Sequence, residues 1–489
     1  MSVFAKFMRK AMLARCRRID HAVTYAVREQ YAALANLLEQ GRDTAFGRRY
    51  GLRGVYSVEQ FIQRVPRFDY DSFNEFIERM RAGEGNVTCP GRVDMFAVSS
   101  GSTSSRSKYI PVTRRSMHRN HLRGMADVVS MYLREHPWSR LFEGRTLTMG
   151  GSCRVERGAL VGDLSALTMS SVGRWTGAVR APSIGVALMD DFDAKCEAIC
   201  RECVGQDIVA IAGVPSWTMA MLRRVLNYTG QSTITQVWQD MELFMHGGVS
   251  FRPYREAFAQ VMGRDINYLE SYNASEGFVA IAERCGCDEM LLMPHYGCYY
   301  EFLRGNDVVP LEGVHADVDY SLMVTSENGL WRYELGDVVR FTSLNPYRLR
   351  IVGRTKQYIN AFGEELMEGN AEEALLRSCK VWASVVEEYT ISAVFTPSTG
   401  GGYHRWIVEF VYPPQDVQGF ARELDVALRD VNSDYDAKRR SIMSQLEIVV
   451  VPYGTFHRWQ CKNQKRKVPR MANDRLLGDE ILNFADVGV

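Results

Sequence analysis

The sequence predicts an α/β protein with a large domain and a smaller second domain. The chain has 489 residues, more than a single hydrophobic core ordinarily needs. Up to Ser275, short apolar runs alternate with amphipathic helical patterns, which is typical of a mostly parallel sheet covered by helices. Short strands separated by turn residues follow, and they predict an antiparallel sheet or barrel appended to the first part.

The N-terminal segment predicts helices. Residues 1–18 carry six Lys and Arg and no acid, a composition shared by transit peptides and membrane-surface helices. The helical pattern continues through residue 41, so we favour an amphipathic helix packed on the protein body. A further helix over 71–83 is predicted to begin at an Asp71 or Ser72 cap and to end at Gly83.

Strands and helices alternate in the rest of the first part. Strands are expected over residues 94–100, 145–151, 207–215, 243–248 and 266–274. Helices are expected over residues 113–136, 216–230, 233–241 and 254–263.

The second part predicts strands first and then a small α+β unit. The antiparallel strands are expected over 278–284, 290–303, 319–326, 329–343 and 347–354. The α+β unit is expected to contain helices 370–379 and 415–432 and strands 386–397, 404–412 and 445–454. We therefore place the domains at residues 1–353 and 354–489, joined by one crossing of the chain.

Composition and charge exclude several classes of function. The 59 Lys and Arg residues nearly balance the 58 Asp and Glu residues, giving a formal net charge of +1 and no broad attraction to nucleic acid. No apolar run is long enough to span a membrane. We expect a cytoplasmic protein, because the eleven cysteines show no disulfide framework, and a monomer by default.

Two groups of cysteines lie close enough in the sequence to be candidate cluster or metal ligands. Cys196, Cys200 and Cys203 have a spacing found in iron–sulfur loops, but they recur at helical positions on one face of an amphipathic pattern. We favour three small side chains in a core stripe. The pair Cys285 and Cys287 lacks a second pair and is a weaker zinc signal.

Polar motifs follow directly on three predicted strands. They are "SSGSTSSRSK" from Ser99, "HGGVS" from His246, and "SYNASEG" ending at Gly277. Because ligands of α/β sheets bind beyond the carboxyl ends of the strands, the three loops are expected to meet at one edge. The first has hydroxyls, Gly101 and Lys108 for holding phosphate, although a solvated turn fits it about as well.

Two carboxylates stand out near these loops. Glu276 follows a strand and is of the type that holds magnesium beside phosphates, with a solvated glutamate at a strand end as the alternative. Asp337 follows a glycine turn in "WRYELGD", where it is suited to accept from both hydroxyls of a ribose, with an ordinary hairpin as the alternative.

Taken together, the motifs resemble the auxin-responsive acyl acid amido synthetase family of adenylate-forming ligases, bacterial members included. The resemblance covers about the whole chain, in the motifs Ser99-Ser100-Gly101-Ser102-Thr103, Lys108-Tyr109-Ile110-Pro111, Tyr272-Asn273-Ala274-Ser275-Glu276, Gly329 to Asp337 and Lys467-Val468-Pro469-Arg470. Ser102 stands where threonine is usual, and Ser104 and Ser105 replace glycines. None of these departures removes a hydroxyl or a charge that the chemistry needs.

The resemblance implies an adenylate-forming ligase architecture with a small mobile C-terminal domain. It implies that ATP activates a carboxylic acid as an acyl-adenylate, which an amine, expected to be an amino acid, converts to an amide. Lys467 and Glu276 would be catalytic, Glu276 through magnesium. The nucleotide would be bound by Ser99, Ser100, Gly101, Ser102, Thr103, Lys108, Gly247, Gly248, Tyr272, Ser275, Asp337 and Arg354.

Three other functions compete with amide formation. An acyl-coenzyme A ligase would use the same adenylation step with a thiol acceptor. A non-catalytic nucleotide- or acyl-binding protein is disfavoured by the presence of Glu276, Asp337 and Lys467 together. A serine hydrolase lacks its Gly-x-Ser-x-Gly elbow, and His246 is expected to be structural.

Overall fold

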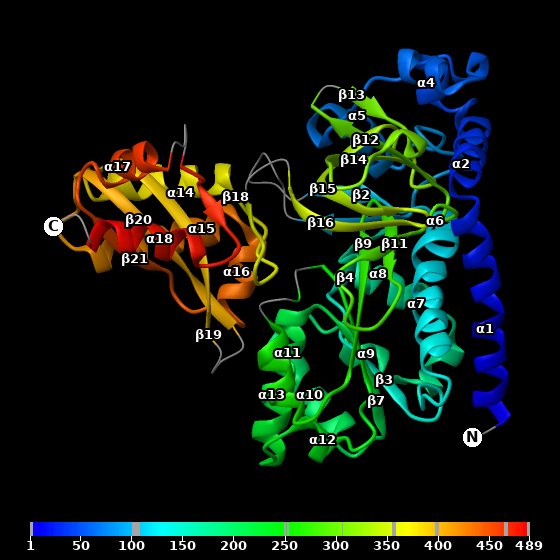
Figure 1. The fold of residues 1–489 in the computed structure, drawn as a ribbon, viewed down its shortest axis with the longest axis horizontal. Coiled ribbons are helices and arrows are strands. Elements are labelled where there is room, and N and C mark those ends of the chain that lie inside the picture. The colour runs from blue at the N-terminus through cyan, green and yellow to red at the C-terminus, as the bar shows by residue number, and fades with distance from the viewer. Residues whose placement is uncertain are drawn as a thin grey trace.

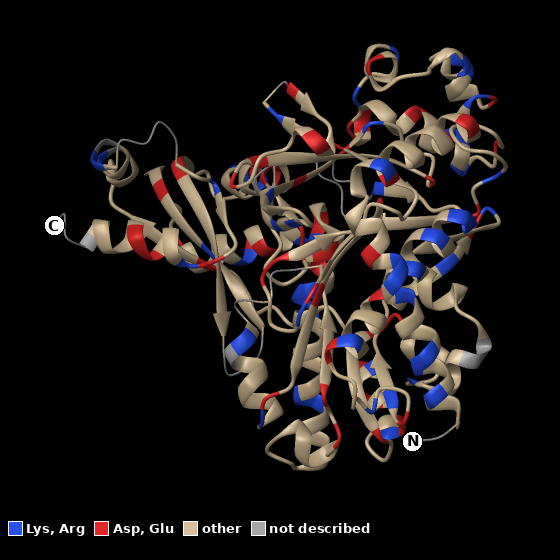
Figure 2. Ribbon diagram, turned by 45° about the vertical axis from the view of Figure 1, so that its right-hand side comes forward, with Lys and Arg blue, Asp and Glu red and all other residues tan. Residues whose placement is uncertain are grey.

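The computed structural model describes residues 3–99, 108–248, 251, 254–305, 307–354, 358–396, 401–463 and 468–486. A large body holds most of the chain, and the C-terminal unit, yellow to red, lies beside it (Figure 1). Lys and Arg, nearly equal in number to Asp and Glu, are interspersed with them along the ribbon (Figure 2). Among the described residues, no helix combines the length and apolar composition needed to cross a bilayer.

One continuous twelve-stranded sheet organises the large body. The five strands at one end pair in parallel, and the other seven are antiparallel. The expected antiparallel part is therefore not a separate barrel, because β10 folds back on β9 and continues the same sheet. In sheet order the strands are β13 (Asp307–Val309), β12 (Cys298–Arg304), β14 (Asp319–Ser326), β15 (Tyr333–Leu344), β16 (Tyr347–Arg354), β11 (Met290–Leu292), β10 (Gly277–Ala282), β9 (Asn267–Ala274), β8 (Leu243–His246), β7 (Ile208–Gly213), β3 (Arg145–Thr148) and β6 (Arg180–Ala181).

The expected strand 94–100 lies in a different sheet from the parallel strands. Its partner across the hydroxyl-rich loop is antiparallel, so this loop closes a hairpin instead of joining a strand to a helix. The expected strand 290–303 is also divided, because a turn at Gly297, where φ is +73°, separates β11 from β12. The second sheet contains, in order, β2 (Lys108–Pro111), β1 (Met95–Ser99), β5 (Ala159–Gly162) and β4 (Cys153–Glu156).

The basic N-terminal helix is docked along the protein, as expected. It runs beside α7 at the edge of the large body (Figure 1), and Arg15 Nε donates to Asp127 Oδ1 at 2.7 Å. The helix expected from 71 starts one residue earlier, because Asp69 caps it and exchanges hydrogen bonds with Ser72. The helices of this body are α1 (Val3–Thr24), α2 (Ala26–Gly41), α3 (Ala45–Arg49), α4 (Val58–Arg64), α5 (Tyr70–Arg81), α6 (Arg114–Ser116), α7 (Leu122–Glu135), α8 (Leu164–Ser171), α9 (Ile184–Ala187), α10 (Phe192–Cys203), α11 (Pro215–Thr229), α12 (Ile234–Val237) and α13 (Arg255–Met262).

The C-terminal unit has its own sheet and its own buried core around Trp406 and Phe420. It touches the large body where Tyr254 Oη donates to the Ala361 carbonyl at 2.5 Å. The strands of its sheet, in order, are β21 (Glu447–Val451), β20 (Gly401–Tyr412), β19 (Val385–Thr396) and β22 (Met471–Ala472). The remaining elements are β17 (Tyr358–Ile359), β18 (Leu366–Met367), α14 (Glu368–Val381), α15 (Val417–Val431), α16 (Ser433–Arg439), α17 (Thr455–Lys462) and α18 (Leu476–Asp486).

Candidate functional site

The fold brings Tyr272 and Asp337 into direct contact. Tyr272 lies near the end of β9, Asp337 lies on β15, and the tyrosine hydroxyl donates to Asp337 Oδ2. Both residues are buried, at 6% and 5% exposure. Arg354 at the end of β16 stands opposite Asp337 in the antiparallel register. Three of the expected nucleotide-binding residues thus come from separate strands to one place.

The turn that carries Ser275 and Glu276 is held by an asparagine that the sequence did not single out. Asn328 Nδ2 donates to the Ser275 carbonyl at 3.4 Å and to the Glu276 carbonyl at 3.2 Å. Its Oδ1 accepts from the Thr113 backbone N–H at 3.3 Å. Asn328 is completely buried, so a single amide fixes the Glu276 turn against the start of the helix after β2.

Glu276 lies within electrostatic reach of Tyr333. Burial, and next the Glu276 and Tyr70 groups, raise the pKa of the Tyr333 phenol well above its ordinary value. Tyr70 in turn reaches Lys108, whose Nζ stands 5.5 Å from the centre of the Tyr70 ring. The Glu276 turn and the base of the hydroxyl-rich loop are therefore linked through two tyrosines, Tyr333 and Tyr70, which lie within electrostatic reach of each other.

The hydroxyl-rich loop has a fixed stem. Ser99 and Lys108 are paired as the last and first residues of β1 and β2, and the Tyr109 N–H donates to Tyr70 Oη at 3.0 Å. The loop residues themselves, Ser100, Gly101, Ser102 and Thr103, lie outside the described residues, as do Lys467 and the side chains of Ser99 and Arg354.

The two glycines after β8 allow the backbone there to pack closely against β9. A Cβ at Gly247 would lie 2.4 Å from the Ser271 carbonyl oxygen, and Gly248 has φ of +85°. The preceding His246 is buried, and its ring stacks on Phe251 at 4.2 Å between centroids. Burial, helped by the Arg255 charge, lowers the pKa of His246 to about 3. A neutral, packed imidazole agrees with the structural role expected for it.

Asn120 and His121 lie on a π-helical turn, Met117–His121. Their side chains contact the Tyr272 motif and the strand that follows it. His121 Nδ1 lies 2.8 Å from Asn273 Oδ1, and Asn120 Oδ1 accepts from the Phe278 N–H at 2.6 Å. The sequence prediction passed over both, because "MHRNH" lies inside an amphipathic helical pattern. Two adjacent polar residues on the buried face of that pattern were the available signal.

The three cysteines of α10 belong to the core, as predicted. Cys196, Cys200 and Cys203 are buried beside Ile199 in one hydrophobic cluster. Desolvation raises the pKa of Cys196 and of Cys203 to about 12. Their spacing reflects packing of thiols on one helix face.

Comparison with known proteins identifies the family. The model of the GH3 family N-terminal domain matches residues 15–157 and 152–266, that of the central domain matches residues 290–354, and that of the C-terminal domain matches residues 369–476. The chain belongs to the GH3 family. The resemblance inferred from the motifs is thereby confirmed.

Relatives and solved structures agree with this assignment. The chain is 22% identical over 465 residues to an indole-3-acetic acid-amido synthetase of Oryza sativa subsp. indica, covering 77% of this chain and 75% of the relative. It is 27% identical over 154 residues to an Arabidopsis thaliana indole-3-acetic acid-amido synthetase, covering 30% of this chain and 26% of the relative.

The fold is shared with adenylate-forming ligases. The structure of GH3.15 acyl acid amido synthetase superposes with a TM-score of 0.63 at 16% identity, covering 97% of this chain and 95% of that one. A 2-hydroxyisobutyryl-CoA ligase with bound 2-HIB-AMP and CoA gives a TM-score of 0.55 at 14% identity, covering 100% and 94%. The expected adenylate-forming ligase architecture is confirmed, and the mobility of the C-terminal domain stays a prediction.

Proposed function

We propose that this GH3-family protein activates a carboxylic acid with ATP as an acyl-adenylate and transfers the acyl group to an amine, expected to be an amino acid. The products are an amide, AMP and pyrophosphate. The observation that carries the proposal is the buried contact of Tyr272 with Asp337, with Arg354 in register beside it. Relatives named as indole-3-acetic acid-amido synthetases, and a solved relative in complex with 2,4-DB, support an organic acid as the substrate.

Four site residues that the structure describes have specific roles in this proposal. Tyr272 offers its ring face to adenine while its hydroxyl holds Asp337 in place to accept from the ribose hydroxyls. Gly247 keeps the backbone after β8 packed against β9, where a side chain would meet a carbonyl, and in the proposal this same backbone approaches the nucleotide. Lys108 stands at the base of the phosphate loop, where its charge supports the polyphosphate.

Magnesium fits the half-buried Glu276, whose turn Asn328 fixes and whose carboxylate is a hard oxygen ligand. When bound, the ion screens the repulsion between the substrate carboxylate and the polyphosphate. The protein's own contribution is to hold Glu276 at the side of the loop stem, by the hydrogen bonds that anchor the turn.

Lys467 is proposed as the cation that stabilises the charge developing in adenylation. A positioned cation of this kind contributes about 3 kcal/mol, or roughly a hundredfold in rate. Lys467 belongs to the C-terminal unit, so we propose that this unit moves over the large body and that the domains meet at 353 and 354, just before β17 begins.

ATP–pyrophosphate exchange with a panel of carboxylic acids tests the proposal. We expect acid-dependent exchange in the wild type, a loss of about a hundredfold in Lys467→Ala, a comparable loss in Glu276→Ala, and full activity in the matched control Lys380→Ala, whose side chain is exposed on α14. ATP binding without exchange for any acid would contradict the adenylation step. With the active acid, amino acids and coenzyme A are then offered as acceptors, and a thioester product without any amide would replace the amide-forming assignment.

A further inference from the structure

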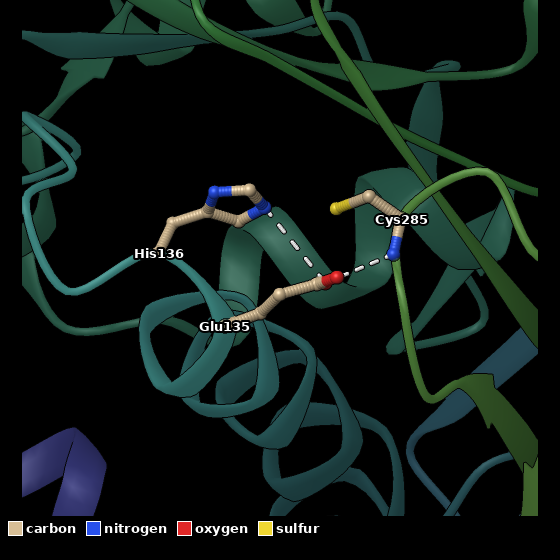
Figure 3. A group of neighbouring side chains, drawn as sticks. All are labelled: Glu135, His136 and Cys285. Atoms are coloured by element: carbon tan, nitrogen blue, oxygen red, sulfur yellow. Dashed lines mark hydrogen bonds and ion pairs between the residues drawn. The ribbon is translucent and has the colours of Figure 1, made fainter.

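Three potential metal ligands gather at the end of α7, away from the residues described so far. One ligand atom each of Glu135, His136 and Cys285 lies within 4.8 Å of the other two. His136 Nε2 is 3.8 Å from Glu135 Oε2, which also accepts from the Cys285 backbone N–H at 3.0 Å. Figure 3 shows the imidazole nitrogen, the carboxylate and the sulfur turned toward a common space.

This cluster lies at the opposite end of β9 from the Tyr272 site. The turn containing Cys285 is attached near the start of that strand, where the Gly286 N–H donates to the Tyr268 carbonyl at 2.8 Å. Asn267 Nδ2 donates to Tyr132 Oη at 3.1 Å, which fixes the last turns of α7 to the same strand end. From Tyr268 to Ala274, the last residue of β9, an extended strand covers about 20 Å, and the Glu276 turn lies beyond that end. The cluster is therefore a separate site.

Neighbouring residues hold the His136 imidazole in place, and its buried Nε2 makes no hydrogen bond to the described residues. Its ring packs 4.7 Å from the Tyr132 ring, and its backbone carbonyl accepts from Arg9 at 3.3 Å. Among the described residues, the buried His136 Nε2 has no hydrogen-bond partner. A buried ring nitrogen without a hydrogen-bond partner is available to ligate a metal ion, and its orientation here is already set by neighbours.

The donor set selects the kind of metal. Thiolate and imidazole favour borderline ions such as zinc, whereas magnesium and calcium take oxygen ligands. With Zn²⁺, one thiolate and one carboxylate leave the site with no net charge, which suits a partly buried position. Metal–ligand bonds of about 2.0–2.3 Å place tetrahedral ligand atoms about 3.3–3.8 Å apart. The separations present here come within side-chain adjustment of that geometry.

We propose that Glu135, His136 and Cys285 bind one Zn²⁺ ion, with water in the fourth position. The ion would join the C-terminus of α7 to the turn between β10 and β11, two segments 150 residues apart in the chain. Burial and the Glu135 carboxylate raise the pKa of the Cys285 thiol to about 12, so without a cation the sulfur keeps its proton. Binding releases that proton from Sγ to solvent as the Zn–S bond forms.

The full-length protein, stripped with a chelator, is titrated with Co²⁺ as a spectroscopic probe and then with Zn²⁺. We expect one equivalent of Co²⁺ to give a thiolate-to-cobalt charge-transfer band that one equivalent of Zn²⁺ removes. Cys285→Ser abolishes the band, and His136→Gln lowers the Zn²⁺ affinity by at least about 100-fold. Cys287→Ser is the matched control, since its thiol lies outside the cluster and the variant is expected to keep the band.

Thermal unfolding of the same variants shows whether each one is correctly folded. Without metal, all should unfold near the wild-type temperature, and Zn²⁺ should raise the unfolding temperature of the wild type and Cys287→Ser alone. No charge-transfer band in the wild type, an unchanged Zn²⁺ affinity in Cys285→Ser, or loss of the band in Cys287→Ser would each overturn the proposal. Binding of Mg²⁺ in place of Zn²⁺ would overturn the thiolate assignment.

Discussion

Replacing Arg332 by methionine should destabilise the large body strongly, because the arginine neutralises a buried glutamate. Arg332 and Glu301 have side chains only 3% and 1% exposed. Arg332 Nε lies 3.1 and 3.0 Å from the two carboxylate oxygens, and Nη1 donates to the Val65 carbonyl at 2.7 Å. The guanidinium thus joins β12, the end of α4 and the loop that leads into β15.

The magnitude follows from leaving one charge without its partner. Removing one member of a buried ion pair costs about 3–5 kcal/mol, whereas replacing both by apolar residues is often close to neutral. For a body of about 350 residues, with an unfolding entropy of about 2.1 cal/mol/K per residue, this loss lowers the unfolding temperature of Arg332→Met by about 4–7 °C. The double variant Arg332→Met, Glu301→Leu should recover most of the loss.

The loss should also depend on pH. Burial raises the pKa of Glu301 even in the presence of Arg332, and removing the arginine raises this pKa further. A carboxyl group whose pKa is higher in the folded state than in the unfolded state is tolerated when protonated. As the pH rises through the folded pKa, the buried carboxyl group ionises and the folded protein loses stability. Arg332→Met should therefore be closer to the wild type at pH 5 than at pH 8.

Calorimetric unfolding of the wild type, the single variant and the double variant at pH 5 and pH 8 measures these effects. A loss below about 1 kcal/mol in Arg332→Met would show that the pair is not needed to compensate a buried charge. A double variant no more stable than the single one would show that Arg332 acts through its backbone hydrogen bonds instead.

Three further predictions concern the site and the contact between the two units. Tyr272→Phe keeps the ring but removes a hydrogen bond to a charged group, so the KM for ATP in pyrophosphate exchange should rise about tenfold or more; an unchanged KM would contradict the ribose assignment. Gly247→Ala puts a Cβ 2.4 Å from a carbonyl oxygen, so it should weaken ATP binding and lower the unfolding temperature in calorimetry. The control Gly177→Ala, whose Cβ would have nothing within 4 Å, should do neither. Equal behaviour of the two variants would contradict the close approach at Gly247. Burial lowers the pKa of Lys438, whose Nζ stands 3.9 Å over the Trp217 ring of the other unit, to about 8. A lysine with a lowered folded pKa binds fewer protons than in the unfolded chain above that pH. Denaturant unfolding should therefore show stability rising between pH 8 and about 10, and Lys438→Met should lose this rise.

The sequence predicted the strands best where burial and turn residues coincide. β7, β8, β9, β14 and β16 fall within the expected ranges, because each is a short apolar or alternating run that turn residues delimit. Which strand pairs with which was harder to predict. The separate sheet of β1 and the continuity of the twelve-stranded sheet depend on pairings that no local pattern encodes.

The same division applies to the candidate site. Tyr272 and Asp337 were named from their motifs, and the fold joins them across 65 positions of sequence. Asn328 and Asn120 were not named, because an amide that anchors a distant turn has the same local sequence as any other amide. Cys285 and Cys287 were only a weak zinc signal in the sequence. The other two proposed ligands, Glu135 and His136, lie far earlier in the chain, so no local motif contains all three.

The position of Asp337 links nucleotide binding to the crossing between the two units. Asp337 pairs with Arg354, the last residue of β16, and the next described element, β17, already belongs to the C-terminal unit. If Asp337 holds the ribose as proposed, the nucleotide sits against the strand end from which the chain leaves the large body. A change in how that strand end is held would then alter the direction in which the C-terminal unit departs. Because Lys467 belongs to that unit, we expect ATP binding and the placement of Lys467 to be coupled through the paired ends of β15 and β16.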